Sequence, residues 1–288
     1  MIRKAVIPAA GFGTRFLPAS KSQPKEMLPI VDTPTIQYVV EEAAASGITD
    51  ILMVIGKGKR AIEEHFDRSF ELEAELAEQG KKRELKAIRR ISNLAHIHFV
   101  WQKELLGLGD AVYHARQHVG NEPFVVLLGD TLIESKTPVT RQLICVFERY
   151  RESVVVLEEV ERSKVSRYGI MKGKPIAPDI YSVEDFVEKP SVRSAPSNLA
   201  IAGRYLFTPE IFGFLRRTRP GKNHEIQLTD AMRMMVKVRP MYGLKVQGKR
   251  YDIGNKLDFL KTNIAFGLRR PELAKDLKAY IKDLARTL

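Results

Sequence analysis

The chain has 288 residues, 44% of them hydrophobic, which is enough to bury the core of one large α/β domain or two small ones. Its 47 Lys and Arg against 35 Asp and Glu give a net charge of +12, dispersed along the chain. Aromatic-interleaved RNA motifs and zinc-finger spacings are absent, so we expect anionic small substrates and no nucleic acid. Without an apolar run of roughly 20 residues or a signal-peptide pattern, the sequence predicts a cytoplasmic protein with no membrane partner.

The domain organisation predicted from the sequence is simple. No linker rich in Ser, Gly or Pro interrupts the chain, so we expect a single domain over residues 1–267 and a helical tail over residues 268–288. The single cysteine, Cys145, excludes a disulfide or a cysteine metal site within the chain. It lies in the apolar pattern QLICVF, which predicts a buried thiol.

The most informative stretch comes first, at Lys4–Pro29. Lys4–Ala9 is a short apolar run typical of a buried parallel strand, and the small residues Ala10–Gly13 follow it. Their N–H groups could approach an anion such as a polyphosphate, although an ordinary turn has the same composition. The pattern is neither a P-loop nor a dinucleotide fingerprint, because it lacks the Lys-Ser or Lys-Thr pair and the third glycine. Arg15 and Lys25 add fixed positive charge.

The next segments predict a βαβ unit and therefore a parallel sheet. We expect Thr33-Pro34 to cap and begin a helix that ends at Gly47, and Ile51–Ile55 to form a second buried strand. Charged helical segments with solvated faces should fill residues 59–93.

A strand predicted over His96–Gln102 ends in a side chain suited to a nucleobase. Gln102 stands at the carboxyl end of a parallel strand, where open α/β sheets bind ligands, and an amide donates and accepts hydrogen bonds at once. Asp110 opens the following helix. It either changes the charge beside a nucleotide or caps the helix, and we favour the cap.

The buried strand Phe124–Leu128 ends in Gly129 and Asp130. A carboxylate just past a central parallel strand could hold Mg²⁺ against a triphosphate, because Mg²⁺ prefers oxygen ligands and takes one or two carboxylates. Aspartate is also common in such turns for structural reasons alone.

The second half of the chain changes pattern. A further strand is expected at Ser153–Glu158, and from Arg167 the pieces become shorter and antiparallel in character. Glu188 and Lys189 follow an alternating strand, where they could contact sugar hydroxyls and a phosphate, although an ordinary surface corner is the alternative. Helices are expected at Pro209–Arg216, Leu228–Val238 and Lys256–Phe266, with an amphipathic helical tail at Pro271–Leu288.

Six phrases then occur in a fixed order, namely GxGTR, PKEMLP, EKP, APSNLAIAGRY, EIQLTDA and YDIGNK. Together they resemble the sugar-phosphate nucleotidylyltransferases, and PKEMLPIVD followed by IQYVVEEA resembles the bacterial UTP–glucose-1-phosphate uridylyltransferases in particular. The resemblance runs from Lys4 to about Gly267. It agrees with the fold class that we predict, a doubly wound α/β domain with a mostly parallel sheet, helices on both faces and small antiparallel sugar-binding insertions. The nucleotide half is about 1–135 and the sugar-phosphate half about 136–267.

The resemblance implies uridylyl transfer from UTP to glucose 1-phosphate with Mg²⁺ as cofactor, giving UDP-glucose and pyrophosphate. Its catalytic residues correspond here to Arg15, Lys25 and Lys189. Its nucleotide-binding residues correspond to Ala10, Gly11, Gly13, Thr14, Gln102 and Gly107. Its sugar-phosphate residues correspond to Gly169, Glu188, Lys189 and Gly203, and its metal-binding residues to Asp130 and Asp252.

Two departures from the family pattern stand out. This chain has GLGDA where the family usually has GLGHA, and Gly-Asp where it often has Pro-Asp or Ala-Asp. Thr229 and Asp230 are expected to serve packing more than chemistry. Thymidylyl transfer to the same sugar phosphate and a non-catalytic nucleotide-sugar sensor are the alternatives, and the sensor would need neither Arg15 nor the two aspartates. A homo-oligomer, dimer or tetramer, is expected.

Overall fold

The computed structural model describes residues 1–221 and 224–287. In this part of the chain no helix is long and apolar enough to cross a membrane. Leu288, the last residue of the predicted tail, lies outside the described residues.

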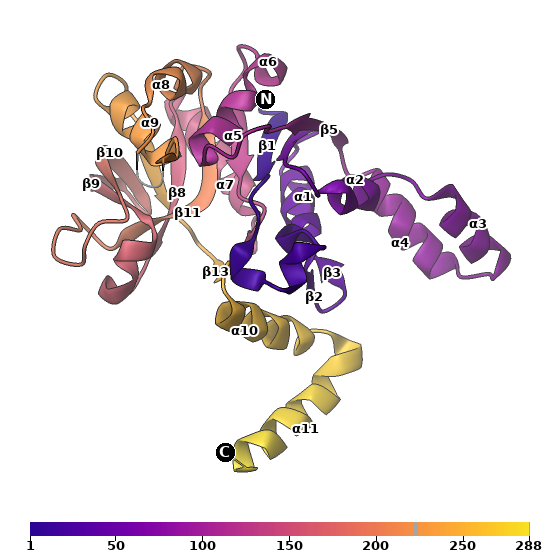
Figure 1. Cartoon of the computed structure of the whole chain (residues 1–288). Helices are drawn as coiled ribbons and strands as arrows, with labels where there is room; N and C mark the ends of the chain where they lie inside the picture. Colours follow the sequence, from indigo (N-terminus) through magenta and orange to yellow (C-terminus); the bar gives the residue numbers. More distant parts are fainter. Residues whose placement is uncertain (222–223, 288) are drawn as a thin grey trace.

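A nine-stranded sheet in the order β5-β4-β1-β6-β11-β8-β12-β10-β9 forms the centre of the molecule (Figure 1). Its strands are β1 (Lys4–Ala9), β4 (Asp50–Ile55), β5 (His96–Trp101), β6 (Phe124–Leu127), β8 (Val154–Glu159), β9 (Gly169–Ala177), β10 (Ile180–Glu188), β11 (Leu199–Phe207) and β12 (Tyr242–Lys245). Two small antiparallel pairs lie beside it, formed by β2 (Pro29–Ile30) with β3 (Thr33–Pro34) and by β7 (Thr131–Glu134) with β13 (Lys249–Asp252).

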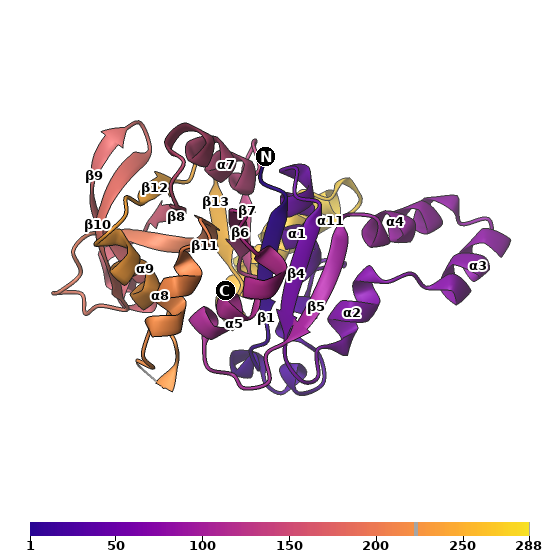
Figure 2. The same ribbon diagram turned by 90° about the horizontal axis from the view of Figure 1, so that it is seen from above.

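The first half of the sheet is parallel and covered on both faces. Strands β5, β4, β1 and β6 all run in one direction. Successive side chains of a strand point to opposite faces, so Val6 and Ile7 of β1 enter two different hydrophobic cores. Helices α1 (Thr35–Ala45) and α7 (Val139–Tyr150) pack in one core, and α5 (Leu108–His114), α8 (Ile211–Arg217) and α9 (Leu228–Val236) in the other (Figure 2). The predicted doubly wound α/β class is confirmed.

The antiparallel part of the sheet is larger than the small insertions that the sequence predicts. Strand β11 lies in the middle of the sheet and pairs antiparallel with both β6 and β8. It is therefore the strand that joins the two halves of the chain into one sheet. Its pairing with β8 shifts register between Ile201 and Tyr205, where Gly203 adopts φ +73°.

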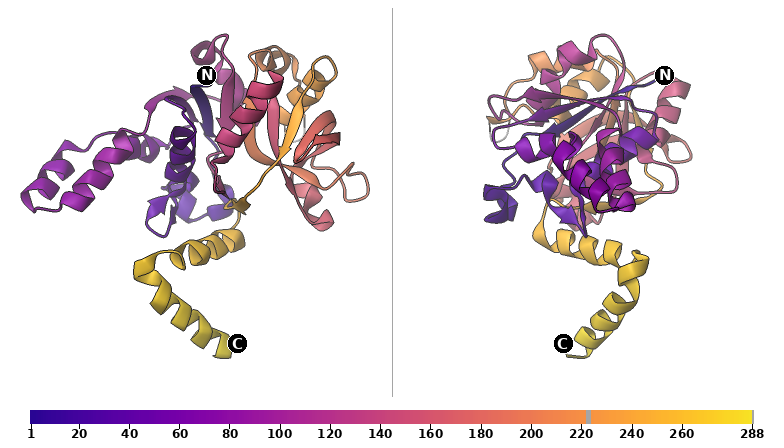
Figure 3. Two further views of the ribbon diagram at one scale, coloured as in Figure 1. Left: turned by 180° about the vertical axis from the view of Figure 1, so that it is seen from behind. Right: turned by 90° about the vertical axis from the view of Figure 1, so that its right-hand side faces the viewer.

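The remaining helices extend beyond the sheet. They are α2 (Arg60–Phe66), α3 (Phe70–Glu78), α4 (Lys82–Ser92), α6 (Arg116–Val119), α10 (Lys256–Gly267) and α11 (Pro271–Thr287). Helices α3 and α4 project as a pair to one side, and α10 and α11 form an arm that leaves the body at the carboxyl end (Figures 1 and 3). Three helices between residues 60 and 92 confirm the charged helical segment, and α11 confirms the helical tail.

Two local predictions are wrong. Thr33-Pro34 does not cap a helix but forms β3, and α1 begins at Thr35, whose N–H donates to the Leu28 carbonyl. Pro34 precedes the helix with an extended backbone, ψ 141°, because it is still paired with β2. Cys145 is exposed rather than buried. Its apolar run is helical, so the neighbours Leu143, Ile144 and Phe147 face the sheet while Cys145 faces solvent.

Candidate active site

A cavity of about 470 Å³ lies at the carboxyl ends of β1, β5 and β6. Parallel α/β sheets bind ligands at this edge, where the strands end and the loops begin. The cavity brings together eight of the residues singled out in the sequence, namely Ala10, Gly11, Gly13, Thr14, Lys25, Gln102, Gly107 and Asp130. All the residues to which the resemblance assigns nucleotide binding therefore line one cavity.

The loop after β1 is shaped by glycine at one position in particular. Gly13 has φ +67°, and a Cβ there would lie 2.9 Å from Cβ of Lys25, closer than real Cβ contacts allow. The Gly13 carbonyl accepts a hydrogen bond from Ser20 Oγ at 2.8 Å, which fixes the loop. Gly11 faces open space. The loop thus passes directly over the stem of Lys25 and leaves room for a ligand above Gly11.

Lys25 and Asp130 form an ion pair inside this cavity. The distance from Lys25 Nζ to Asp130 Oδ2 is 2.6 Å. Burial alone would lower the pKa of Lys25, but the charges of Asp130 and Glu26 outweigh it and raise that pKa. For Asp130, burial opposes ionisation, yet the charge and hydrogen bond of Lys25 lower the pKa. Both groups are therefore charged at neutral pH.

A second, more deeply buried ion pair, between Glu26 and Lys59, holds the turn that carries Lys25. Glu26 Oε2 accepts from Lys59 Nζ at 2.8 Å, and the two side chains are only 2% and 5% exposed. Burial raises the pKa of Glu26, partly offset by the charges of Lys59 and Lys25. The pair ties the turn that carries Lys25 to the segment just before α2. Sequence reasoning missed Glu26, although it stands inside the phrase PKEMLP.

Gln102 is held by Asp110, whose predicted role as a cap is wrong. Gly107 is the residue that precedes α5, with no side-chain cap, and Asp110 lies in the first turn. Nε2 of Gln102 donates to Asp110 Oδ2 at 2.7 Å and to the Gly107 carbonyl at 3.2 Å. A carboxylate only accepts, so these two partners fix which end of the amide is nitrogen. Among the described residues none donates to Oε1 of Gln102, which leaves that oxygen for a ligand.

The second half of the chain closes this side of the cavity. Gly107 has φ +100°, and a Cβ on it would lie 2.7 Å from Cβ of Glu225. The N–H of Gly109 donates to the Ile226 carbonyl at 2.8 Å, and the Ile226 N–H donates back to Leu106 at 2.7 Å. Glu225 also lines the cavity. The phrase EIQLTDA therefore serves to hold the loop that carries Gly107.

A second group of predicted residues gathers where β9 starts and β10 ends. Glu188 accepts from the Thr229 hydroxyl at 2.7 Å and lies 3.2 Å from the ammonium of Lys189. A Cβ on Gly169 would lie 3.1 Å from both Glu188 Oε2 and Thr229 Oγ1. Lys189 adopts φ +44°. Thr229, which we expected to serve packing, thus orients the carboxylate of Glu188.

Tyr168 and Arg15 connect the two groups of residues. Lys189 donates its N–H to the Tyr168 carbonyl at 3.0 Å, and the Tyr168 hydroxyl donates to Asp252 Oδ2 at 3.0 Å. Oδ1 of Asp252 accepts from the N–H of Gly254 at 3.0 Å. Arg15 donates from Nη1 to the Gly254 carbonyl at 3.3 Å and so reaches from the first loop to this turn. No pattern in the sequence singles out Tyr168.

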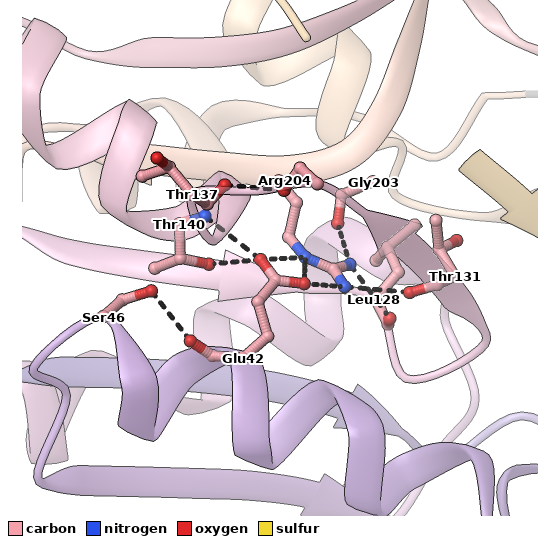
Figure 4. A network of polar contacts seen from close by, with 9 residues as sticks. Glu42, Ser46, Leu128, Thr131, Thr137, Thr140, Gly203 and Arg204 are labelled. Atoms are coloured by element: carbon pink, nitrogen blue, oxygen red, sulfur yellow. Dashed lines mark hydrogen bonds and ion pairs between the residues drawn. The ribbon is translucent and has the colours of Figure 1, made fainter. Parts of the chain in front are cut away.

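A buried network fixes the loop that carries Asp130 (Figure 4). Arg204 of β11 is fully buried and donates all five N–H groups, to the Glu42 carboxylate and to three carbonyls. These carbonyls belong to Leu128, Thr131 and Gly203. Glu42 also accepts from the N–H and hydroxyl of Thr140. The network holds α1, β11 and residues 128–131 in one arrangement.

Gly203 belongs to this support. A Cβ there would lie 3.1 Å from Thr131 Oγ1 and 3.3 Å from Leu128 Cδ1, and its carbonyl accepts from the Leu128 N–H at 3.0 Å. These contacts explain the glycine by its close approach to the Asp130 loop. Its predicted contact with a sugar stays a prediction.

Comparison with known proteins agrees with this geometry. A family model described as nucleotidyl transferase matches residues 4–266. The chain is 52% identical to a UTP–glucose-1-phosphate uridylyltransferase of Staphylococcus epidermidis over 98% of both chains. It is also 52% identical to the UTP–glucose-1-phosphate uridylyltransferase YngB of Bacillus subtilis, over 99% of this chain and 96% of that one.

Solved structures give the same result. The UTP-bound UGPase from Acinetobacter baumannii superposes with a TM-score of 0.91 at 39% identity, covering 99% of this chain and 100% of that one. The match to the family model spans nearly the whole chain, and the cavity, the glycine loop and the lysine–aspartate pair all lie inside it. The chain therefore belongs to the nucleotidyl transferase family, among its UTP–glucose-1-phosphate uridylyltransferases.

Proposed function

We propose that this protein transfers the uridylyl group of UTP to glucose 1-phosphate, forming UDP-glucose and pyrophosphate. The observation that carries the proposal is the ion pair of Lys25 and Asp130 in a cavity that also contains the glycine loop and Gln102. The relatives described above bear the name of this activity. Their identity over nearly full length supports the same substrates here.

The reaction needs no side-chain nucleophile. A phosphate oxygen of glucose 1-phosphate attacks the α-phosphorus of UTP, a new P–O bond forms, and the bond to the leaving pyrophosphate breaks. The main obstacle is to bring two polyanions together while negative charge develops on the α-phosphate and the pyrophosphate. We assign Lys25 and Arg15 to the triphosphate and Lys189 to the sugar phosphate. Catalysis then consists of positioning and electrostatic stabilisation.

The family generally uses a divalent metal ion, and we propose Mg²⁺ held by Asp130 and Asp252. Bound there, the ion would neutralise charge on the phosphates. Asp130 already holds a cation, the ammonium of Lys25, so its carboxylate is a fitting place for positive charge. Asp252 is oriented by Tyr168 and Gly254, and oxygen donors are what Mg²⁺ prefers. Lys25 would be freed from Asp130 to contact phosphate.

The sugar side provides the first test. Lys189→Ala should raise the KM for glucose 1-phosphate by about 10- to 150-fold, because a charge-assisted contact to phosphate contributes about 1.5–3 kcal/mol. UTP affinity should stay within about twofold, since Lys189 lies with Glu188 and Gly169 outside the nucleotide cavity. Steady-state kinetics with each substrate varied in turn measures both effects. The matched control is Lys172→Ala, which removes an exposed lysine of β9 that pairs with Glu184. Loss of UTP binding with an unchanged KM for the sugar phosphate would place Lys189 on the wrong substrate.

Base choice follows from the fixed amide of Gln102. Only Oε1 is left for the base, so we propose that it lies opposite N3, where uracil and thymine carry an N–H and cytosine carries none; the only N–H donor of the cytosine ring is the amino group one position away. Both N–H groups of the amide are taken by Asp110 and Gly107, so in this proposal Gln102 accepts from the base and does not also donate to it. A site built to bond a substrate N–H rejects an analogue without it by up to about 10⁴-fold.

We therefore expect UTP to be preferred over CTP by on the order of 10⁴-fold, and over dTTP by only about 10- to 200-fold, where one methyl group decides. Pyrophosphate release with each triphosphate against glucose 1-phosphate measures these ratios and tests the proposed activity itself. Gln102→Ala should lower the preference for UTP over CTP by about 100-fold. Equal use of dTTP would favour the thymidylyltransferase alternative, and a catalytically silent protein would favour the sensor. An unchanged rejection of CTP in Gln102→Ala would remove Gln102 from base recognition.

A homo-oligomer and a cytoplasmic location stay predictions. The feature that favours an oligomer is helix α11, which leaves the body of the molecule (Figure 3). Leu273, Tyr280 and Leu284 of this helix are 40%, 64% and 44% exposed within the single chain. A second copy that covered them would remove apolar surface from water.

A further inference from the structure

Three potential metal ligands lie close together near the amino-terminal end of β4, away from the proposed nucleotide cavity at the carboxyl ends of the strands. Asp50 is the first residue of β4, His98 lies in β5, and His118 lies in α6. The cavity lies at the other, carboxyl ends of these strands. The two ends of β4 are five residues apart, which at about 3.3 Å per residue is a distance of roughly 17 Å. The group is therefore distinct from the proposed active site.

The geometry of this His-His-Asp group is compact. Oδ1 of Asp50 lies 2.7 Å from Nε2 of His118 and 3.8 Å from Nε2 of His98. One ligand atom from each residue lies within 4.8 Å of the other two. In a tetrahedral site with metal–ligand distances of about 2.0–2.1 Å, ligand atoms lie about 3.3 Å apart. Shifts of well under 1.5 Å thus bring all three atoms to one centre.

We propose that Asp50, His98 and His118 bind a transition-metal ion of the Zn²⁺ class, with water in the remaining position. Imidazole nitrogen suits Zn²⁺, Co²⁺ and Ni²⁺, whereas Mg²⁺ prefers oxygen ligands throughout. The two metal sites of this protein then differ in chemistry. Mg²⁺ is assigned to the carboxylates of Asp130 and Asp252, and Zn²⁺ to the His-His-Asp group.

The surroundings support an ion here. The three side chains are 27%, 54% and 24% exposed, in the order Asp50, His98, His118, so an ion enters from solvent. Lys4, which contacts the backbone of His118, is already neutralised. Its ammonium lies 2.6 Å from Glu122 and donates to the carbonyls of His118 and Val119 at 3.1 Å each. These bonds also fix the backbone that carries His118. Asp50 stands on β4 and His98 on the edge strand β5, and the two strands are paired along their whole length, so both ligands stand on hydrogen-bonded strands.

Bound metal should stabilise the fold by joining α6 to β4 and β5, because an ion that binds the native state alone raises the melting temperature. The experiment uses full-length protein freed of metal with a chelator and then dialysed against micromolar Zn²⁺. We expect one equivalent of zinc per chain and a higher melting temperature. Co²⁺ should give the ligand-field absorption bands of a tetrahedral site.

The chain offers a matched control. His96 lies two residues before His98 in β5 and is exposed, but it is not part of the group. His98→Ala and His118→Ala should each weaken zinc binding by on the order of 100-fold and abolish the thermal shift, while His96→Ala behaves as wild type. Asp252→Asn should keep the equivalent of zinc, which separates this site from the proposed Mg²⁺ site.

Two outcomes would overturn the proposal. One is a wild-type protein that binds no zinc at micromolar concentration. The other is a His98→Ala protein that binds zinc and shifts its melting temperature like wild type. Because His98 is mostly exposed, its alanine variant should melt as wild type in the presence of chelator, so loss of folding does not obscure the result.

Discussion

An Asp130→Asn enzyme should keep its fold and lose turnover by about three orders of magnitude or more. The carboxylate of Asp130 holds Lys25 at 2.6 Å beside the glycine loop and is the proposed ligand of Mg²⁺. An amide of the same shape removes the charge that both partners require. Turnover measured across a Mg²⁺ titration, with circular dichroism on the same samples, tests this expectation.

The matched control is Asp185→Asn. Asp185 lies in β10 and pairs with the exposed side chain of Arg233, so its loss should change turnover less than twofold. Normal activity of Asp130→Asn at every Mg²⁺ concentration would show that Asp130 only supports the turn. Lys25→Met should resemble Asp130→Asn in turnover, because it removes the other half of the pair.

The same pair makes stability depend on pH in a defined direction. Lys25 lowers the pKa of Asp130, so the pair stabilises the fold fully above the ordinary aspartate pKa of about 3.9. This contribution is lost as pH falls through the lowered folded-state value. Asp130→Asn should therefore be relatively less destabilised at acid pH than at pH 7.

Arg204→Met should lower the free energy of unfolding by about 3–5 kcal/mol, the largest effect on stability that we expect. The substitution leaves the Glu42 carboxylate, of which only 10% is exposed, without its cation, and removes one donor from each of three carbonyls. Denaturant unfolding measures the loss. Turnover of the folded protein should also fall, because residues 128–131 lose the network that holds the Asp130 loop.

A second substitution separates the ion pair from simple packing. Glu42→Leu combined with Arg204→Met removes both charges, and a buried pair replaced by apolar groups is often nearly neutral. The double variant should therefore be more stable than Arg204→Met alone, a coupling that a double-mutant cycle quantifies. Arg233→Met, at an exposed ion pair, should cost no more than about 1 kcal/mol. An Arg204→Met protein as stable as this control would show that the network is dispensable.

The residues that line the cavity were more predictable from the sequence than the contacts between them. Lys25 and Asp130 each follow a local pattern, a glycine loop and a strand end, so both were singled out. Their ion pair joins residues 105 positions apart, and no local pattern encodes such a contact. Gln102 was likewise expected at a strand end, yet the hydrogen bond that it donates to Asp110, which orients it, was not.

The fold was predictable to a similar depth. Buried strands such as β4 and β6 appear as short apolar runs, because side chains on both faces of a central strand are covered. The position of β11 in the sheet depends on long-range pairing, and the sequence predicted only its antiparallel character. The error at Cys145 came from treating an apolar run as uniformly buried, whereas a helix buries one face only.

During synthesis on the ribosome, β6 emerges about 70 residues before β11, the strand that pairs along its open side. A nascent chain that ends before Leu199 therefore presents the apolar residues of β6 as an unpaired edge, which is prone to pair with other chains. Most residues that line the cavity around Lys25 and Asp130 precede Thr131, yet they belong to the part of the chain that is left with this unpaired edge. Residues 1–135 therefore do not form a module that could be transplanted alone, and the lining of this cavity is complete only when Glu225 has also been synthesised.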